Sequence, residues 1–323
     1  MSIPPIIAPV DVELLKKELN QDTFLRRTTR GNNEIYVVNN ENAPNVLREI
    51  GRLREVSFRA VGGGSGTECD LDHFDLDDKA CFQLVVWNPE ADEIIGGYRF
   101  TRWSMASFHE NGQPYVNTEH LFDFSQKFID EYFPYCIEMA RAFIQPKYQS
   151  AQAGRKALFA LDNLWEGIGG LVAKDPSVKY LSGKVTIYSS SPEISRKAMV
   201  YYLDKYFGDR EGLLTSKNPE TWTPEQAEMF EKMFTGEDYK ENYLILNNFV
   251  KSLGDTIPPL IHSYIWLSPS MKTFGTTFDP DFGDCYDTAM IITVADIYKE
   301  KKERYIDSYN DEDYGQITLA RKS

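Results

Sequence analysis

Apolar side chains recur at helical spacing over much of this chain. The clearest case is residues 43–60, where the apolar positions share one side of a helical wheel and the arginines lie elsewhere on it. The charge-rich segment 207–256 is predicted to be mostly helical, because Thr223 and Pro224 form a typical helix start ahead of Gln226. The same spacing predicts further helices over 9–20, 154–173 and 192–206.

Shorter apolar stretches bounded by turn residues predict strands. Residues 82–88 and 93–103 flank a turn at 89–92, and this arrangement predicts a β-hairpin. Comparable stretches predict strands over 34–39, 135–145, 180–188, 261–267, 271–274 and 286–295.

The order of these elements is typical of an α/β domain with a mixed sheet. We expect the strands before and after residues 207–256 to belong to one sheet. This predicts a single domain over residues 1–298, in which 207–256 is a helical insertion before the last strands. Residues 299–323 are highly charged, so we expect them to form a C-terminal tail that frays.

The composition is that of a folded, globular chain. Hydrophobic residues make up 42% and aromatic residues 13% of the 323 residues, which excludes a disordered or collagen-like protein. The four cysteines form no CxxC pair, so we expect neither a zinc ribbon nor a thioredoxin-like redox site. No segment approaches the roughly 18 consecutive apolar residues of a membrane helix, and residues 1–20 lack a secretory pattern. We therefore expect a cytoplasmic protein.

Charge is unevenly distributed along the chain. The formal net charge is −14, which argues against a nucleic-acid partner. Residues 141–205 nevertheless carry 10 basic and 5 acidic side chains, and we call this stretch the basic block. The basic block is either a local fluctuation or a docking surface for an anionic ligand or partner.

Several familiar catalytic motifs do not occur. The sequence has no GxSxG, GxxxxGK[ST] or HExxH motif. The glycine run at 62–66 does not lie between a predicted strand and a predicted helix, so it does not indicate a dinucleotide site. Asp70, Asp72 and Asp75 lack the rest of an EF-hand loop, and we expect no metal site.

Charged residues interrupt otherwise apolar segments at four places. A glutamate or an arginine in the middle of an apolar strand needs a partner or solvent, because an unpaired buried charge is costly. One interpretation is an ion network that ties an N-terminal helix to the sheet, and another is an acid–base site with the same members. The two are compatible. The four motifs are Arg54–Phe58, Asp70–Asp75, Gly96–Arg99 and Glu138–Arg141.

Taken in this order, the four motifs resemble those of the GNAT-related N-acyltransferases. That family includes bacterial ornithine and glycine N-acyltransferases, some of which carry the label hemolysin, and it is more remotely similar to the acyl-homoserine-lactone synthases. The resemblance implies a GNAT-like fold, with a mixed, mostly antiparallel sheet flanked by helices. It extends to shorter matches at 146–148, 161–167, 180–183, 257–264 and 278–287.

The resemblance implies a reaction and a set of catalytic residues. The reaction would move a fatty acyl group, a long-chain 3-hydroxy acyl group in our hypothesis, from a thioester to the amine of an amino acid such as ornithine or glycine. Glu138 would act as the general base, and backbone N–H groups between Glu138 and Phe143 would stabilise the oxyanion. The implied catalytic residues are Glu138, Arg141, Asp72, Asp75, Arg99 and Arg54.

The resemblance also implies a binding site for the acyl donor. The pyrophosphate loop of GNAT enzymes corresponds to residues 149–154 here, with Gln152 in place of a glycine. This departure favours acyl carrier protein over coenzyme A as the carrier of the acyl group, and an acidic carrier protein would suit the basic block. No permanently bound cofactor is expected. The implied donor-binding residues are Phe143, Lys147, Gln152, Gly154, Arg155 and Lys156.

Several alternatives stay open at this stage. The chain could be an acetyl-CoA-dependent enzyme, a signal synthase of the same superfamily, or a non-catalytic binding or membrane-perturbing protein of the same fold. Cys136 could act as a nucleophile on paper, although no histidine partner is obvious. Tyr188 could protonate the leaving thiolate or could simply pack in the core. A lipid product would bring the enzyme into peripheral contact with the inner membrane.

Overall fold

The structure is a computed structural model that describes residues 3–77, 81–149, 155–310 and 317. Its internal contacts divide the chain into two compact units, each assembled from separate segments. Unit 1 comprises Met1–Thr101, Glu138–Val178 and Lys299–Ser323, and unit 2 comprises Arg102–Ile137 and Lys179–Tyr298. Within the described residues, no helix is both long and apolar enough to cross a membrane.

Unit 1 contains a sheet whose strands follow the predicted pattern. The hairpin of β3 (Phe82–Asn88) and β4 (Glu93–Arg102) is antiparallel, as expected. β2 (Glu34–Val38) pairs with β3, and a short strand that we did not predict, β1 (Phe24–Arg27), pairs with β2. On the other side of the hairpin, β6 (Cys136–Ile144) follows β4.

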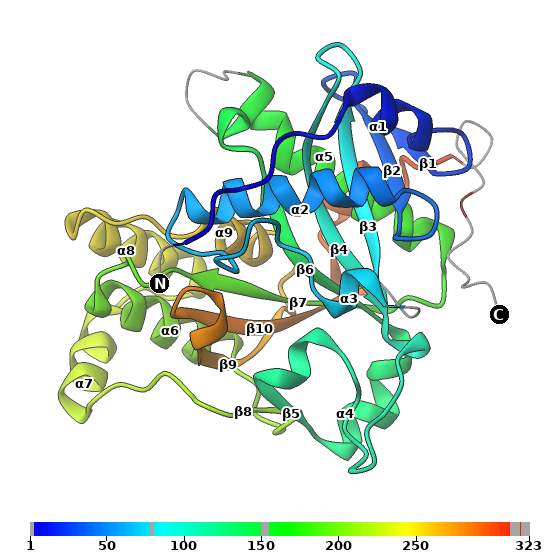
Figure 1. The fold of residues 1–323 in the computed structure, drawn as a ribbon. Coiled ribbons are helices and arrows are strands. Elements are labelled where there is room, and N and C mark those ends of the chain that lie inside the picture. The colour runs from blue at the N-terminus through cyan, green and yellow to red at the C-terminus, as the bar shows by residue number, and fades with distance from the viewer. Residues whose placement is uncertain (1–2, 78–80, 150–154, 311–316, 318–323) are drawn as a thin grey trace. The chain divides into compact units, whose positions relative to one another are not determined.

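Helices cover both faces of these strands. The alternation of side chains along β3 places Gln83, which contacts α2 (Pro44–Arg59), on one face. Leu84 lies on the other face and packs against Gly167 of α5 (Arg155–Lys174). Figure 1 shows α2 in front of the strands and α5 behind them. Two short helices, α1 (Val12–Glu18) and α3 (His73–Leu76), complete the N-terminal part.

The predicted fraying beyond residue 298 is wrong for the first part of that segment. Residues Lys299–Tyr305 form the helix α10, which packs on α5. The hydroxyl of Tyr305 donates to Asp162, and its carbonyl accepts from the buried Arg26 of β1 at 3.3 Å. Charge along the segment predicted exposure, whereas long-range contacts to Asp162 and Arg26 hold the helix in place.

Substitutions at two adjacent glycines of α5 test whether α10 packs on this helix. A Cβ atom at Gly169 would overlap the backbone carbonyl of Tyr305, whereas a Cβ at Gly170 would meet only flexible side chains, the nearest being Leu25 at 3.2 Å. We expect Gly169→Ala to lower the free energy of unfolding by about 1–3 kcal/mol, as overpacking does. Gly170→Ala, the matched control, should be neutral or stabilising because alanine favours a helix. Urea denaturation measures both, and equal effects would contradict the docking.

Unit 2 contains a second set of antiparallel strands. β10 (Cys285–Thr293) pairs with β7 (Tyr180–Ile187) on one side and with β9 (Lys272–Asp279) on the other. The strands before and after residues 207–256 are therefore neighbours, as predicted. A separate small ribbon pairs β5 (Phe122–Phe124) with β8 (Leu214–Ser216). Antiparallel pairing in both units confirms the predicted mostly antiparallel α/β fold.

The helices of unit 2 agree with the predictions except at two places: α4 (Gln126–Glu131) was not predicted, and one predicted strand is a helix. Thr223 forms the expected capping box at the start of α7 (Pro224–Met233). Residues 261–267 were predicted to be a strand and instead belong mostly to a helix, α9 (Pro259–Ile265). Pro259 sits in the first turn, and the buried side chains recur at Ile261, Tyr264 and Ile265, a helical spacing. The remaining helices are α4 (Gln126–Glu131), α6 (Glu193–Phe207) and α8 (Tyr239–Ser252).

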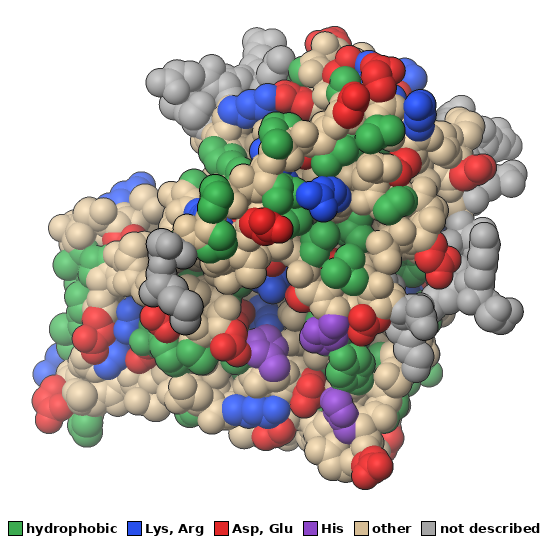
Figure 2. Space-filling view, viewed as in Figure 1, with side chains coloured by type: hydrophobic (Ala, Val, Ile, Leu, Met, Phe, Trp, Pro, Cys, Tyr) green, Lys and Arg blue, Asp and Glu red, His purple; other side chains and the backbone are tan. Residues whose placement is uncertain are grey.

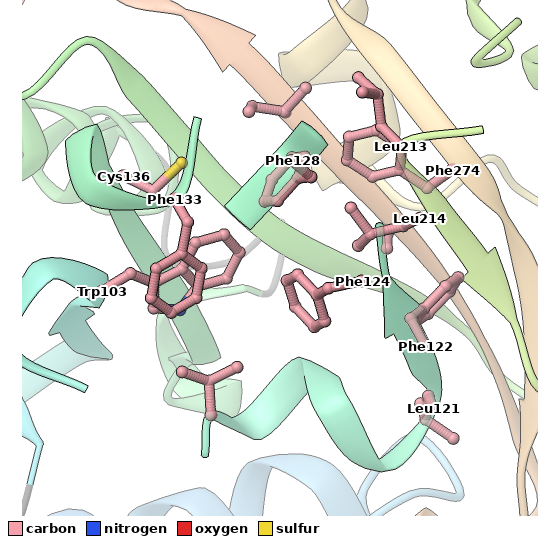
Figure 3. Packing of buried hydrophobic residues seen from close by; sticks show 13 residues of the cluster. Trp103, Leu121, Phe122, Phe124, Phe128, Phe133, Cys136, Leu213, Leu214 and Phe274 are labelled. Carbon is pink, nitrogen blue, oxygen red and sulfur yellow. The ribbon is translucent and has the colours of Figure 1, made fainter. Parts of the chain in front are cut away.

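The core of unit 2 is rich in aromatic side chains. Trp103 is fully buried there and stacks on Phe133, with ring centroids 4.9 Å apart. Phe124 and Phe128 meet the Trp103 ring edge to face (Figure 3). Cys136 is a member of the same apolar cluster. On the face shown in Figure 2, acidic and basic side chains are interspersed rather than sorted by sign.

Candidate active site

Five of the six residues predicted to be catalytic form one ionic network in unit 1. Arg54 comes from α2, Arg99 from β4 and Arg141 from β6, so helix and sheet contribute to the same cluster. The acidic members are Asp72 and Asp75, at the start of the short helix α3. The interpretation as a network that ties an N-terminal helix to the sheet is therefore confirmed.

The two aspartates are fixed by a capping box. The Asp72 side chain accepts from the backbone N–H of Phe74 at 2.9 Å, and the Asp75 side chain accepts from the N–H of Asp72 at 3.2 Å. The Asp-x-x-Asp spacing is what this reciprocal capping needs. It holds both carboxylates toward the arginines.

Asp75 is the buried centre of the network. Its carboxylate accepts from Nη1 of Arg54 at 3.1 and 3.2 Å and from Nη1 of Arg99 at 3.1 Å. Gln83 of β3 donates to Asp75 at 2.8 Å and accepts from Arg54 at 2.5 Å. Burial opposes ionisation of Asp75, but Arg54 and Arg99 outweigh burial and lower the pKa of Asp75 below its usual range.

Asp72 connects the buried centre to the surface. It accepts from Arg99 at 2.6 Å and from Arg141 at 3.4 Å. Burial again disfavours the charged form, and the two guanidinium groups, Arg99 first, still lower the pKa of Asp72 well below its usual range. The side chains of Asp72 and Arg141 are 27% and 20% exposed, so solvent reaches the network at this end.

The strand that carries Glu138 and Arg141 has an irregular backbone. Glu138 is buried, with 4% of its surface exposed. Arg141 has φ = 51°, a left-handed conformation that is rare for a residue other than glycine. The alternation of side chains that a regular strand would have is therefore interrupted at Arg141. Strain of this kind persists where neighbours enforce it, and it concentrates at functional sites.

Two glycines of β4 allow this strand to approach closely. A Cβ atom at Gly96 would overlap the carbonyl oxygen of Phe143, and one at Gly97 would lie 3.1 Å from the Phe143 ring. The backbone of the strand end thus runs against β4 at a distance that only glycine permits. This explains the Gly-Gly pair that precedes Arg99 by two residues.

A thiol lies within the same cluster. Burial raises the pKa of the Cys81 thiol to about 11, while Arg99 and the Thr101 hydroxyl act in the opposite direction and Glu138 adds to the rise. The raised pKa disfavours the thiolate, which is the nucleophilic form of cysteine. Cys136, the nucleophile considered from the sequence, is buried in the apolar cluster of unit 2.

The predicted donor-binding residues are only partly described. Phe143 is buried and packs over Gly97. Lys147 forms an ion pair with Glu93, so a phosphate group would have to compete with that carboxylate. Gln152 and Gly154 lie outside the described residues, and so do the side chains of the last two predicted residues, Arg155 and Lys156 at the start of α5.

Two members of the network, Gln83 and Asp70, were not among the residues predicted to be catalytic, although Asp70 belongs to the second motif. Gln83 lies opposite Arg99 in the β3–β4 pairing, and its only signal was a polar residue inside an apolar strand. Asp70 is 2% exposed, its Oδ1 lies 3.7 Å from Arg141, and its Oδ2 has no hydrogen-bond partner among the described residues. Burial raises the pKa of Asp70. The described residues contain no group of three or more His, Cys, Asp or Glu side chains that could hold a metal ion.

Comparisons with known proteins place the chain in a family. Residues 53–158 match the profile of the acetyltransferase (GNAT) domain. The chain is 46% identical over 304 residues to the glycine N(alpha)-acyltransferase of Phocaeicola vulgatus, covering 94% of this chain and 93% of that protein. It is 47% identical over 304 residues to the glycine N(alpha)-acyltransferase of Bacteroides thetaiotaomicron, covering 94% of this chain and 90% of that protein.

Solved structures give more distant similarities. The structure of the CoA-dependent acyl-homoserine lactone synthase BjaI with SAM and isopentyl-CoA is 12% identical, covers 83% of this chain and 85% of its own, and has a TM-score of 0.35. The synthase LasI is 11% identical and has a TM-score of 0.28 over 47% of this chain and 72% of its own. The high identity over nearly the whole length to the two relatives above decides the classification: the chain belongs to the same family of GNAT-domain N-acyltransferases as they do.

Proposed function

We propose that this N-acyltransferase transfers a fatty acyl group from a thioester donor to the amino group of glycine. The observation that carries the proposal is the buried carboxylate of Glu138 on a strand that turns left-handed three residues later, beside an ionic network. Both relatives are named glycine N(alpha)-acyltransferases, which favours glycine over ornithine as the acceptor.

The chemistry needs a base and an oxyanion site. An ammonium group has no lone pair, so Glu138 removes a proton from the amine, directly or through a water molecule. The amine nitrogen then forms a bond to the thioester carbonyl carbon, and the carbonyl oxygen becomes negative. Backbone N–H groups between Glu138 and Phe143 stabilise that oxygen. The C–S bond then breaks, and the nitrogen gives up its second proton, which the leaving thiolate takes up, so that an amide and a free thiol remain. Glu138 returns the first proton to solvent.

The proposed acyl carrier is acyl carrier protein, with coenzyme A as the alternative. The support is the basic block at 141–205, which includes the start of α5, a 20-residue helix. The N-terminus of a long helix attracts the phosphate of a pantetheine arm. The proposed acyl group is long-chain and 3-hydroxylated. The product would then be an aminolipid whose acyl chain partitions into a bilayer, so the enzyme would meet the membrane through its product.

A direct assay tests the proposed reaction. The purified enzyme is incubated with glycine or ornithine and with long-chain 3-hydroxyacyl carrier protein, the matching acyl-CoA or acetyl-CoA, and the products are measured by mass spectrometry. We expect N-acylglycine, formed fastest from the carrier-protein donor. Transfer from acetyl-CoA alone would overturn the long-chain donor, and transfer to ornithine but not glycine would overturn the acceptor.

Charge reversal at the start of α5 tests the carrier. We expect Arg155→Glu combined with Lys156→Glu to weaken binding of acyl carrier protein at least tenfold at low salt, mainly through slower association. The control reverses Lys16 and Lys17, an adjacent basic pair on α1 outside the basic block, and should leave binding unchanged. Stopped-flow association rates measure both, and equal rates for the two double variants would refute the docking surface.

A further inference from the structure

Arg99 has an unused hydrogen-bonding edge inside the ionic network. The residue is 1% exposed, and among the described residues its donors are satisfied at Nη1 alone, which donates to Asp72 at 2.6 Å and to Asp75 at 3.1 Å. The Nε and Nη2 atoms are buried and have no hydrogen-bond partner among the described residues. Buried guanidinium donors without partners are rare, because each loses its hydration without compensation.

The geometry of the unused edge indicates its ligand. Nε and Nη2 lie side by side on one edge of the planar guanidinium group, and their N–H bonds point in the same direction. Two parallel N–H donors match the two oxygens of a carboxylate, the bidentate pairing that arginine forms best. The ring of Phe74 packs against the guanidinium, 5.4 Å from Cζ to the ring centroid. Because Nη1 is held by Asp72 and Asp75, the plane of the guanidinium group is fixed. We call its Nε and Nη2 donors the fork.

Arg99 and the candidate base, Glu138, lie in the same part of unit 1. Arg99 lies on β4, and Glu138 lies on β6, the next strand of the sheet. The network reaches solvent at one end, where the side chains of Asp72 and Arg141 are 27% and 20% exposed. In glycine, a single carbon separates the carboxylate from the amine, which suits an anchor and a base that are near each other.

We propose that the Nε–Nη2 edge of Arg99 binds the carboxylate of the acceptor amino acid. The assignment rests on the proposed function, since it concerns the acceptor of that reaction. Arg99 would then determine which acceptor is used, because an amine without a carboxylate would leave the Nε and Nη2 donors of Arg99 without a partner. A water molecule that fills the fork permanently is the competing outcome.

Acceptor analogues give the first test. The ratio of kcat/KM for glycine to that for glycinamide, which keeps the amine and loses the carboxylate charge, should be about 10²-fold in the wild type, since a site built for a polar group rejects analogues without it. Arg99→Lys keeps the charge and loses the fork. We expect this variant to raise KM for glycine and to reduce the ratio to about tenfold or less. Methylamine serves as a second amine without a carboxylate.

A matched variant separates recognition from stability. Arg196→Lys removes a buried guanidinium outside the ionic network, one whose Nε already donates to Glu220 at 2.9 Å. It should lower the melting temperature as Arg99→Lys does, yet it should keep the wild-type ratio of glycine to glycinamide. An unchanged ratio in Arg99→Lys would overturn the assignment.

A binding measurement on the wild type covers the case in which Arg99→Lys does not fold. Glycine, and acetate as a bare carboxylate, are titrated into ¹⁵N-labelled enzyme while the arginine Nε–Hε signals are recorded. We expect one buried signal to shift with both ligands and none to shift with methylamine. No shift at saturating glycine would mean that water occupies the fork. Absence of glycine acylation would overturn the proposed function itself, whereas acylation without carboxylate discrimination would overturn only this inference.

Discussion

Replacing Glu138 with Gln is expected to lower kcat for glycine acylation by about 10²–10⁴-fold, the usual contribution of a positioned general base. Glutamine keeps the size of the side chain but cannot accept the proton of the ammonium group. Because Glu138 is buried on a strand, the amide should be accommodated without displacing the strand. The KM for the acyl donor should change little, since the side chain acts on the amine.

The control for this substitution is another buried glutamate of unit 1. Glu49 lies on α2, is 6% exposed and pairs with Arg52. We expect Glu49→Gln to retain activity within about twofold even if it is less stable, because Glu49 pairs with Arg52 and accepts from the N–H of Val10, both outside the ionic network. Initial rates from a thiol-release assay measure both variants. If Glu138→Gln keeps more than a tenth of the wild-type rate, Glu138 is not the base.

Replacing Asp75 with Asn is expected to lower the free energy of unfolding by about 3–5 kcal/mol, the cost of breaking a buried ion network by removing one partner. Two guanidinium groups, those of Arg54 and Arg99, share the Asp75 carboxylate at 3.1 Å, and neither is exposed. An amide cannot balance their charge, and its NH₂ group would face donors. Urea denaturation at neutral pH measures the loss.

Asp70 offers a matched comparison five residues away in the sequence. It is equally buried, but its Oδ2 has no partner within the part of the chain that the structure describes, and its Oδ1 lies 3.7 Å from Nη2 of Arg141. Burial raises the pKa of Asp70, so its charged form is disfavoured in the folded state. We expect Asp70→Asn to cost less than about 1 kcal/mol, or to stabilise, by removing a poorly paired buried charge. Equal losses for Asp70→Asn and Asp75→Asn would contradict this description of the network.

The pH dependence of stability follows from the directions in which the pKa values of these aspartates are shifted. The pKa values of Asp72 and Asp75 are lowered in the folded state, so their stabilisation is complete above the unfolded value of about 3.9 and is lost as pH falls through the folded values. The pKa of Asp70 is raised instead, so its buried charge destabilises the fold near neutral pH. This destabilisation disappears when Asp70 takes up a proton as the pH falls. The stability difference between wild type and Asp75→Asn should therefore narrow below about pH 4.

Local patterns in the sequence were sufficient for most of the secondary structure. The hairpin at 82–103, the helix at 43–60 and the capping box at Thr223 were all predicted and are confirmed. Each depends on side chains within a few residues of one another, where periodicity and capping preferences act directly. The ordered motifs also sufficed to indicate the family, because they lie in regular elements at characteristic separations.

Contacts between distant segments decided what the sequence left open. The pairing of Asp75 with Arg54 and Gln83, the left-handed backbone at Arg141 and the unused edge of Arg99 all depend on how α2, α3, β3, β4 and β6 come together. The same holds for α10, whose charged sequence predicted fraying and whose contacts with Asp162 hold it on α5. Charge and periodicity along a chain report local preference, whereas burial and pairing are set by partners far away in sequence. The sequence by itself thus determined the elements, the motifs and the family, and the tertiary structure decided which charges are paired, which are buried and which donors are left for a ligand.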